Sequence, residues 1–223
     1  MKRITAAALI GSTVLFFVVN LIHPKEYTRN HEAQQLKSIA DNYTRWQLAH
    51  FLTFVSMLLF VIVVLGLASL LYSRLDRMAI AGGLLGLFGL VALGGVLALD
   101  GFTWGVLGEV TTFPSADQHT LEVALKAVQQ SHWNLYFYVG GLGWHIGLLI
   151  LSIGLIRTRL IPAAVGWVFA LGVVLVGIEA AIENNAYFIA ASAVLAVGGV
   201  GVGLALRGGD EVDSRRLGDV SAG

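Results

Sequence analysis

Long apolar stretches separated by short islands of charge constrain this chain more than any other feature of its sequence. Hydrophobic residues make up 57% of the 223 residues and charged residues only 13%, against about a quarter in a typical soluble domain. The charges are not spread evenly, because they gather between the apolar stretches. This pattern predicts a polytopic membrane protein, and it excludes a soluble enzyme, a nucleic-acid binder with a basic face and a fully disordered chain.

Six stretches have the length that a membrane-spanning helix requires, which is about 20 mainly apolar residues. They are residues 4–22, 47–72, 79–100, 133–156, 161–182 and 186–206. We therefore expect an all-α bundle of six transmembrane helices over residues 1–207, followed by a disordered cytoplasmic tail over residues 208–223. The first stretch begins like a secretory signal peptide, but its length and the lack of a small-x-small cleavage site predict a retained helix.

Two polar segments each predict one short helix outside the membrane. In residues 24–45, Asn30 precedes a helix-favouring sequence that it can cap. In residues 101–132, Pro114 is followed by a capping-box spacing from Ser115 to Gln118. Apolar residues then recur at helical intervals, which predicts an amphipathic helix on the outer face.

The basic residues predict the orientation, because cytoplasmic segments of membrane proteins carry an excess of them. With the N-terminus inside, nine basic residues lie on the inner side: Lys2, Arg3, Arg74, Arg77, Arg157, Arg159, Arg207, Arg215 and Arg216. Five lie on the outer side: Lys25, Arg29, Lys37, Arg45 and Lys126. We therefore expect a multi-pass protein of the plasma membrane with both termini in the cytoplasm.

Several chemistries are excluded by residues that the sequence lacks. There is no cysteine, so disulfides, thiolate metal sites, iron–sulfur clusters and c-type haem attachment are excluded. No lysine lies inside an apolar stretch, which excludes a retinal Schiff base. No HExxH or similarly tight ligand spacing occurs, so no metal ligand, catalytic residue or cofactor-binding residue is assigned.

Ionisable and strongly polar residues inside or beside a span are costly, and they are therefore candidates for function. The outer-site candidates are His50, Asp100, Glu179, His23, Asn20 and Glu183. At 1.5 Å of rise per residue, His50 lies about 6 Å below the outer boundary, and the others lie at similar depth. We expect the side chains of His50, Asp100 and Glu179 to converge there, with His23 or Asn20 close by.

His145 is a separate candidate, because the same arithmetic places it about 18 Å from the outer boundary, near the middle of the membrane. We expect it to point into the bundle and to hold a partner, such as Asn20, Glu179, a Ser/Thr hydroxyl or a backbone carbonyl on a neighbouring helix. It is either a structural hydrogen-bonding residue or a ligand-binding or proton-relay residue.

Small residues recur at spacings that allow two helices to approach closely. The pairs are Gly82 and Gly86, Gly143 and Gly147, and Gly199 and Gly203, each four residues apart. They predict either packing within the bundle or a seam between two copies of the chain.

Short motifs at the predicted outer ends of the spans carry a resemblance to known proteins. Leu21-Ile22-His23-Pro24, Arg45-Trp46-Gln47-Leu48-Ala49-His50 and Ala98-Leu99-Asp100-Gly101 are the stretches concerned. In these the chain resembles a broad set of bacterial and archaeal six-span membrane proteins of unknown function. The resemblance implies a six-span fold and no activity, and it favours Trp46, His50 and Asp100 as parts of one outer site.

These observations favour a non-catalytic multi-pass protein: a small-ligand or lipid binder, a transporter-like module or an accessory subunit. The alternative is a membrane redox or hydrolytic enzyme that holds a metal or haem with histidine and carboxylate ligands. A proton-coupled carrier is a third class, although only His145 lies near the midplane, where such carriers bind their ions. The expected partners are the lipid bilayer and either a small molecule or another membrane subunit, without nucleic acid.

Overall fold

The computed structural model describes residues 1–24, 31–130, 133–182 and 184–220, without the side chains of 98–100, 133–134, 136–137, 179–182 and 209–220. Over this part the chain forms helices and no strands. In chain order they are α1 (Lys2–Ile22), α2 (Glu32–Asp41), α3 (Tyr43–Tyr72), α4 (Asp76–Val110), α5 (Gln118–Gln129), α6 (Trp133–Arg157), α7 (Ala163–Ile182) and α8 (Asn185–Val220). The predicted all-α membrane bundle with two short additional helices is confirmed.

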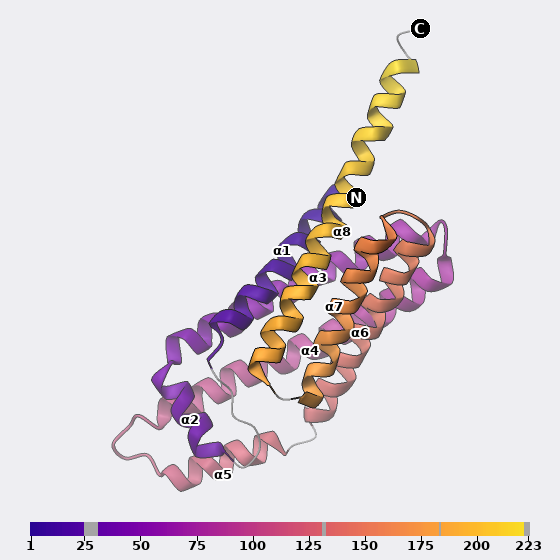
Figure 1. Cartoon of the computed structure of the whole chain (residues 1–223). Coiled ribbons are helices and arrows are strands. Elements are labelled where there is room, and N and C mark those ends of the chain that lie inside the picture. Colours follow the sequence, from indigo (N-terminus) through magenta and orange to yellow (C-terminus); the bar gives the residue numbers. More distant parts are fainter. Residues whose placement is uncertain (25–30, 131–132, 183, 221–223) are drawn as a thin grey trace.

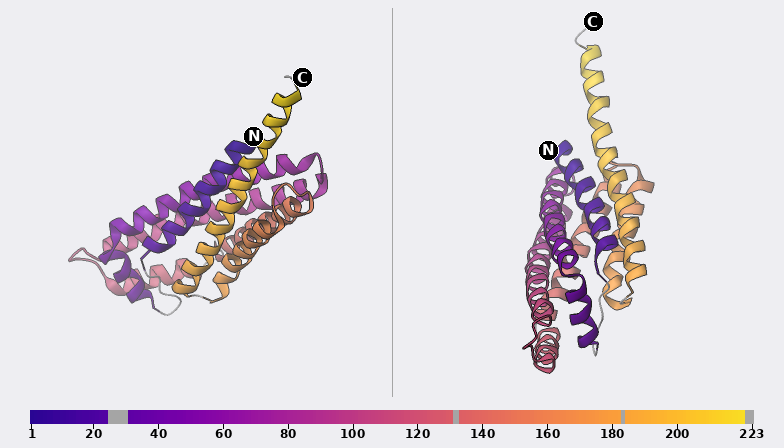
Figure 2. Two further views of the ribbon diagram at one scale, coloured as in Figure 1. Left: turned by 45° about the horizontal axis from the view of Figure 1, so that its top comes forward. Right: turned by 90° about the vertical axis from the view of Figure 1, so that its left-hand side faces the viewer.

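The six long helices form a closed ring in which each one packs between two others. α1 contacts α3 and α8, α4 contacts α3 and α6, and α7 contacts α6 and α8. Neighbouring helices run in opposite directions, and α1 and α8 lie side by side although they are the first and last helices (Figures 1 and 2). The ring is therefore closed by the two ends of the sequence.

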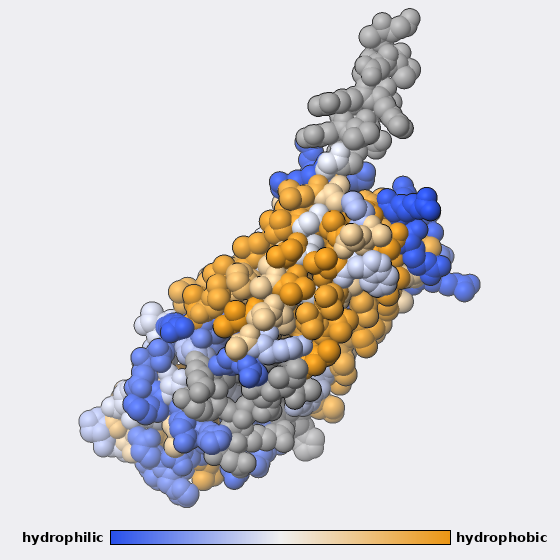
Figure 3. Space-filling view, viewed as in Figure 1, coloured by the Kyte–Doolittle hydropathy of each residue, from blue (hydrophilic) through white to orange (hydrophobic). Residues whose placement is uncertain are grey.

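The two ends of the bundle differ in what covers them. At one end, which we name the cap end, lie the short helices α2 and α5 (Figure 1). The other, the turn end, holds residues 73–75 and 158–162, which join α3 to α4 and α6 to α7, together with the start of α1. On the face seen in Figure 3, a broad apolar belt separates hydrophilic surfaces at these two ends, as expected for a membrane protein.

Five helices are long and apolar enough to cross a membrane: α1, α3, α4, the described part of α6 from Tyr138, and α8 as far as Gly208. The expected fifth span, residues 161–182, corresponds to α7, whose described apolar part, Ala163–Ile178, is shorter. Six helices thus occupy the places of the six expected spans, and the crossing by α7 stays a prediction.

The helix α4 extends beyond the expected span boundary at Asp100. It continues to Val110 as a helix of 35 residues, so residues 101–110 project beyond the expected span instead of forming a loop. No proline interrupts this segment. Its glycines pack against α2 and α3, and this packing offsets the low helix propensity of glycine, which is about 1 kcal/mol below that of alanine.

The ends of other helices also differ from expectation. α5 begins after Asp117, which accepts a hydrogen bond from the His119 amide, and not after Ser115. The residue before α2 is His31, while Asn30 lies outside the described residues. α8 continues to Val220, although residues 208–223 were expected to be a disordered tail. This segment contains no proline and places Glu211 four residues before Arg215, a spacing that favours a helix.

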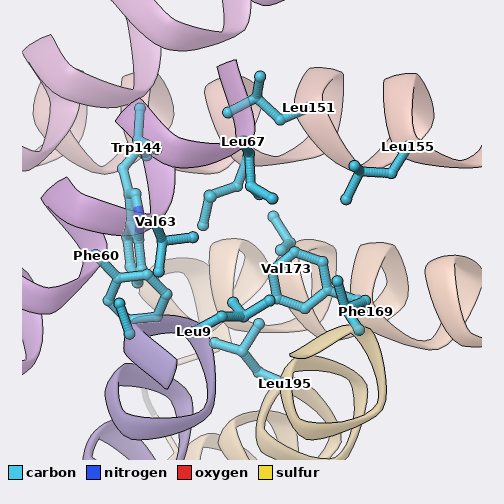
Figure 4. Close-up of a cluster of buried hydrophobic side chains, with 14 of the residues drawn as sticks. Leu9, Phe60, Val63, Leu67, Trp144, Leu151, Leu155, Phe169, Val173 and Leu195 are labelled. Atoms are coloured by element: carbon cyan, nitrogen blue, oxygen red, sulfur yellow. The ribbon is translucent and has the colours of Figure 1, made fainter. Parts of the chain in front are cut away.

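The centre of the ring is filled by large apolar side chains from all six long helices. Leu9, Phe60, Leu67, Trp144, Leu151, Leu155, Phe169, Val173 and Leu195 point toward one another in Figure 4, and each is at most 2% exposed. The buried hydroxyl groups of Ser12, Thr13, Thr53 and Ser152 bond carbonyls of their own helices. The middle of the bundle is therefore a packed, apolar core.

The glycine spacings mark contacts within the bundle. A Cβ atom on Gly147 of α6 would lie 2.3 Å from the backbone nitrogen of Gly86 in α4 and 2.8 Å from the carbonyl oxygen of Gly82. A Cβ atom on Gly203 of α8 would lie 3.0 Å from the Ala6 carbonyl oxygen in α1. The three motifs therefore let neighbouring helices of the ring touch backbone to backbone, as the first of the two alternatives predicted.

Candidate binding site at the cap end

The extension of α4 presents one face of glycine residues to its neighbours. Gly101, Gly105 and Gly108 are spaced by four and three residues, so they lie on the same face of the helix. A Cβ atom on Gly101 would lie 2.6 Å from the His50 ring, and one on Gly108 would lie 2.4 Å from a side-chain carbon of Ile39. α2 and the start of α3 are therefore seated directly against the backbone of α4.

Four ring side chains gather on this face, and we name them the His–Trp cluster: His23, Trp46, His50 and Trp104. The ring centroids of His23 and Trp46 are 5.1 Å apart, those of His23 and His50 also 5.1 Å, and those of Trp46 and His50 4.4 Å. Trp104 stacks on Trp46 at 6.0 Å with planes 15° apart. Three helices, α1, α3 and α4, thus supply one contiguous group of rings.

Hydrogen bonds to the backbone fix the orientation of these rings. The indole Nε1 of Trp46, which is 1% exposed, donates to the carbonyl oxygen of Gly101 at 3.2 Å. His50 Nδ1 lies 2.9 Å from the Trp46 carbonyl oxygen, and His23 Nδ1 lies 2.9 Å from that of Pro24. A carbonyl oxygen only accepts, so Nδ1 of each imidazole carries the hydrogen and Nε2 of the neutral ring is an acceptor.

Burial and charge both act on His23, which follows the last residue of α1. Burial lowers the pKa of the His23 imidazole below its usual value, and the positive charge of Arg45 lowers it further. The hydrogen bond to the Pro24 carbonyl acts in the opposite direction but is outweighed. Arg45 is held at this place because its Nε donates to the carbonyl oxygen of Ile22. His23 is therefore neutral at neutral pH.

Folding stability should fall on acidification because of His23. In the unfolded chain the imidazole has the usual histidine pKa of about 6.5 and in the folded protein a lower pKa, so below pH 6.5 the unfolded state binds a proton that the folded state does not. The His23→Gln variant, which cannot titrate there, should lose less stability than wild type between neutral pH and about pH 5. Thermal unfolding in detergent measures this.

The control for this measurement is His119→Gln, since the His119 side chain is exposed on α5. That variant should follow the wild-type pH profile. If His23→Gln also followed the wild-type profile, the burial of a neutral His23 would not contribute to the stability.

Trp104 carries a hydrogen-bond donor for which the described residues supply no partner. This donor, the indole Nε1, is buried. Buried polar atoms without a partner are rare in native proteins, and such atoms usually bond water or a ligand. This donor belongs to the same group of rings as the two imidazoles, and sequence reasoning did not single it out.

The other predicted outer-site residues have different outcomes. Asn20 lies one turn before His23, and its side-chain nitrogen donates to the Phe16 carbonyl oxygen of its own helix at 2.8 Å. Asp100 directly precedes Gly101, but its side chain and that of Glu179 are outside the described part of the chain, as is the whole of Glu183. The structure thus brings His23 and His50 together, and the expected approach of Asp100 and Glu179 stays a prediction.

His145 lies between α6 and α7, away from the cap end. Its Nδ1 lies 2.6 Å from the carbonyl oxygen of Gly141, one turn earlier in its own helix, and its ring packs on Gly177 of α7. Its buried Nε2 has no hydrogen-bond partner in the described residues. The partner shown is therefore a backbone carbonyl of the same helix, and not a carbonyl on a neighbouring helix as expected.

Replacing His145 by leucine should change the free energy of unfolding by about 1 kcal/mol or less. The substitution removes one hydrogen bond within a helix, but it also removes a buried nitrogen without a partner, and these effects oppose each other. Thermal unfolding in detergent provides the measurement, with Ser152→Ala as a matched loss of one intrahelical bond. A much larger loss of stability would mean that Nε2 holds a group which the structure does not contain.

A polar hollow of about 330 Å³ lies further out at the cap end, between α2, the end of α4 and α5. Lys37 and Asp41 form an ion pair at 2.9 Å on its α2 side, and Thr111 and Glu122 line the opposite side. Its volume is at the lower limit for small-molecule sites. It is an open surface depression and contains none of the predicted site residues.

The apolar ring of long helices and its capped end define a multi-pass helical membrane protein. A family described as a domain of unknown function (DUF4386) matches residues 4–206, and the chain belongs to this family. The match runs from the first turn of α1 through the apolar part of α8, so it includes every helix of the ring. It confirms the resemblance to membrane proteins without an assigned activity. No curated protein and no solved structure matches the chain.

Proposed function

We propose that the protein is a non-catalytic membrane protein that binds a small molecule at the His–Trp cluster. The observation that carries this proposal is the buried Trp104 Nε1, a donor without a partner within the described residues, in the same cluster as two imidazoles. A bound molecule that accepts a hydrogen bond from this nitrogen would remove the cost of leaving it unpaired, about 1–3 kcal/mol.

The chemistry of the cluster indicates what kind of molecule it would take. The half-buried rings of Trp104 and His50 offer flat apolar surfaces, and the indole nitrogen of Trp104 requires an acceptor. Arg45, exposed at the rim, adds a positive charge that favours a carboxylate or another anionic acceptor. The proposed ligand class is therefore a small, flat, partly apolar molecule with a carbonyl or carboxylate group.

The core of the bundle favours binding over transport. Transporters place polar or ionisable groups near the midplane, often where a helix is broken. Here the described core is filled by apolar side chains, its buried serine and threonine hydroxyls mostly bond to carbonyls of their own helices, and His145, the one site candidate near the midplane, packs between α6 and α7. A polar solute would therefore have to separate packed helices to pass, which supports a site that opens to one side.

Haem does not fit between the paired histidines. The rings of His23 and His50 touch at a centroid distance of 5.1 Å, which leaves no space for a porphyrin between them. Their Nδ1–H bonds to carbonyls resemble those of metal-bound histidines. However, the described residues contain no group of three His, Cys, Asp or Glu side chains placed to hold a metal ion. The alternative is an enzyme that uses a metal, and the test below distinguishes it from the proposed non-catalytic protein.

The test compares small-molecule binding in matched variants of the detergent-purified protein. Benzoate, benzamide and related flat carbonyl compounds are screened for an increase in the melting temperature of wild type. Trp104→Phe keeps an aromatic ring but removes the donor, so compounds that use it should lose about tenfold in affinity. Trp167→Phe, on the exposed surface of α7, should bind them as wild type does.

Two results would refute the proposal. If every stabilising compound acted equally on wild type, Trp104→Phe and His50→Ala, the His–Trp cluster would not be the binding site. If the purified protein carried a stoichiometric metal ion that His50→Ala removed, the metal-enzyme alternative would replace the non-catalytic proposal.

We also propose that the protein lies in the plasma membrane with the cap end outside and both termini in the cytoplasm. The nine-to-five distribution of basic residues supports this orientation. Single cysteines at Ser38 and Ser115 should therefore react with a membrane-impermeant thiol reagent in intact cells, and one at Ser214 should not. The chain has no native cysteine to interfere. If only Ser214→Cys were labelled, the orientation would be the opposite of the proposed one.

A further inference from the structure

Four arginines gather at the turn end of the bundle: Arg74 and Arg77 beside the α3–α4 turn, and Arg157 and Arg159 beside the α6–α7 turn. Arg74 Nη1 donates to the Thr158 carbonyl oxygen at 3.1 Å, between the two arginines of the other turn. Arg157 Nη1 in turn lies 3.9 Å from the sulfur of Met78, which follows Arg77. The two turns are thus in contact, and their arginines form one group.

This group carries an uncompensated positive charge. All four side chains are exposed, and none forms an ion pair in the part of the chain that the structure describes. Asp76 is the one carboxylate within residues 73–77 and 157–162, and its Oδ1 accepts from the backbone nitrogen of Arg77 at 2.7 Å. The group therefore has a net charge of about +3 at the edge of the apolar belt, where lipid phosphates lie.

Arg159 has a backbone conformation that normally favours glycine. Its φ angle is 55°, the one positive φ at a non-glycine residue among the described residues. It follows the end of α6 at the position where helices commonly place a glycine, because a side chain costs about 1 kcal/mol or more in this conformation. A charged side chain thus occupies a position where glycine would be more stable.

An apolar stripe continues from this group along the surface of α4. Ile80, Leu84 and Phe88 follow Arg77 at intervals of three and four residues, and they are 48%, 65% and 58% exposed. Residues at this spacing lie on one face of a helix. The stripe is therefore an exposed track of apolar side chains that begins at the arginines and runs toward the middle of the membrane.

We propose that Arg74, Arg77, Arg157 and Arg159 bind the phosphate of an anionic phospholipid, with one acyl chain along the stripe on α4. Guanidinium groups match phosphate oxygens with paired hydrogen bonds, and several arginines favour a headgroup that carries net negative charge. The apolar stripe distinguishes a lipid from a soluble phosphate compound, which would have no use for it. This inference concerns the end of the bundle opposite the His–Trp cluster, so it is independent of the proposed function.

The test measures the affinity of the full-length, delipidated protein in neutral detergent for phosphatidylglycerol and phosphatidylcholine, by native mass spectrometry and by melting temperature. Phosphatidylglycerol should bind more tightly. The double variant Arg77→Gln with Arg157→Gln should lose about 25-fold in affinity, at about fivefold for each arginine. The matched control, Arg3→Gln with Arg207→Gln, removes two arginines at the same end but on α1 and α8, and it should change the affinity less than about twofold.

A second variant separates lipid binding from folding. Arg159→Gly relieves the strained backbone, so the melting temperature of the delipidated protein should rise. The same change removes one of the four charges, so phosphatidylglycerol affinity should fall about fivefold. A residue with a merely structural role would not move these two measurements in opposite directions.

Three results would overturn the proposal. If the double variant and its α1–α8 control lost the same affinity for phosphatidylglycerol, the lipid would respond to the overall positive charge of this end and not to a site formed by the four arginines. Equal binding of phosphatidylcholine would remove the need for an anionic headgroup. If glycerol phosphate raised the melting temperature as much as phosphatidylglycerol did at equal concentration, the ligand would be a soluble phosphate compound and not a lipid.

Discussion

Replacing Trp46 by alanine should lower the free energy of unfolding by about 3–5 kcal/mol, the range for removing a buried tryptophan. Trp46 is 1% exposed, contacts the rings of His23, His50 and Trp104, and donates a hydrogen bond to the Gly101 carbonyl oxygen. Its loss would leave a cavity and a buried carbonyl without this donor. Thermal and chemical unfolding of the detergent-purified protein provide the measurement.

Trp167→Ala is the matched control, because Trp167 is 57% exposed on the surface of α7. This change should cost much less, since little buried volume is lost. Equal destabilisation by the two substitutions would mean that Trp46 does not anchor the cap end on α4. In the Trp46→Ala variant, His23 should also no longer lower the folding stability at low pH, because the burial of the His23 ring depends partly on the indole.

Replacing Gly147 by alanine should destabilise the bundle by about 3 kcal/mol, at the upper end of the usual range for overpacking. The new methyl group would lie 2.3 Å from the backbone nitrogen and 2.5 Å from the Cα atom of Gly86. Backbone atoms cannot rotate out of the way as side chains can, so α4 and α6 would have to move apart along their length. The melting temperature in detergent should fall accordingly.

Gly94→Ala provides the comparison within the same pair of helices, because among the described residues no atom beyond its own helix backbone and chain neighbours lies within 4 Å of a Cβ at that position. Alanine has the higher helix propensity, so this variant should be as stable as wild type or up to about 1 kcal/mol more stable. If Gly147→Ala were equally well tolerated, the close backbone approach of α4 and α6 would not contribute to stability.

The membrane helices could be predicted from the sequence because hydrophobicity and length alone determine a span. The end of α4 could not be predicted in this way. Asp100 followed by Gly101 has the composition of a span terminus, and two further glycines at 105 and 108 weaken a helix in isolation. Residues 101–110 are helical because α2 and α3 pack on their glycine face, and such tertiary contacts override local propensity.

Depth along the membrane is a one-dimensional quantity, and it brought His23 and His50 to the same level correctly. It did not indicate the neighbour that each ring would contact, because this depends on the order of helices around the ring. His145 illustrates this limit of depth estimates. Its depth predicted that it would have a hydrogen-bond partner, but it did not predict that the partner would be the carbonyl oxygen of Gly141 in its own helix. The spacing of Gly101, Gly105 and Gly108 was the available indication of the site, and so was the nearby Trp104.

The contact between α1 and α8 affects how the protein can be assembled during its synthesis. Thr13 and Ala6 of α1 face Gly199 and Gly203 of α8, which is synthesised after the other helices of the ring. That side of α1 must therefore stay in lipid until α8 has been synthesised. The hydroxyl group of Thr13 already bonds the carbonyl oxygen of Leu9 within α1, so it can meet hydrocarbon on this face without being unpaired. Hydroxyl groups that bond carbonyls of their own helix therefore serve both the finished core and the stage at which α1 is in lipid without α8.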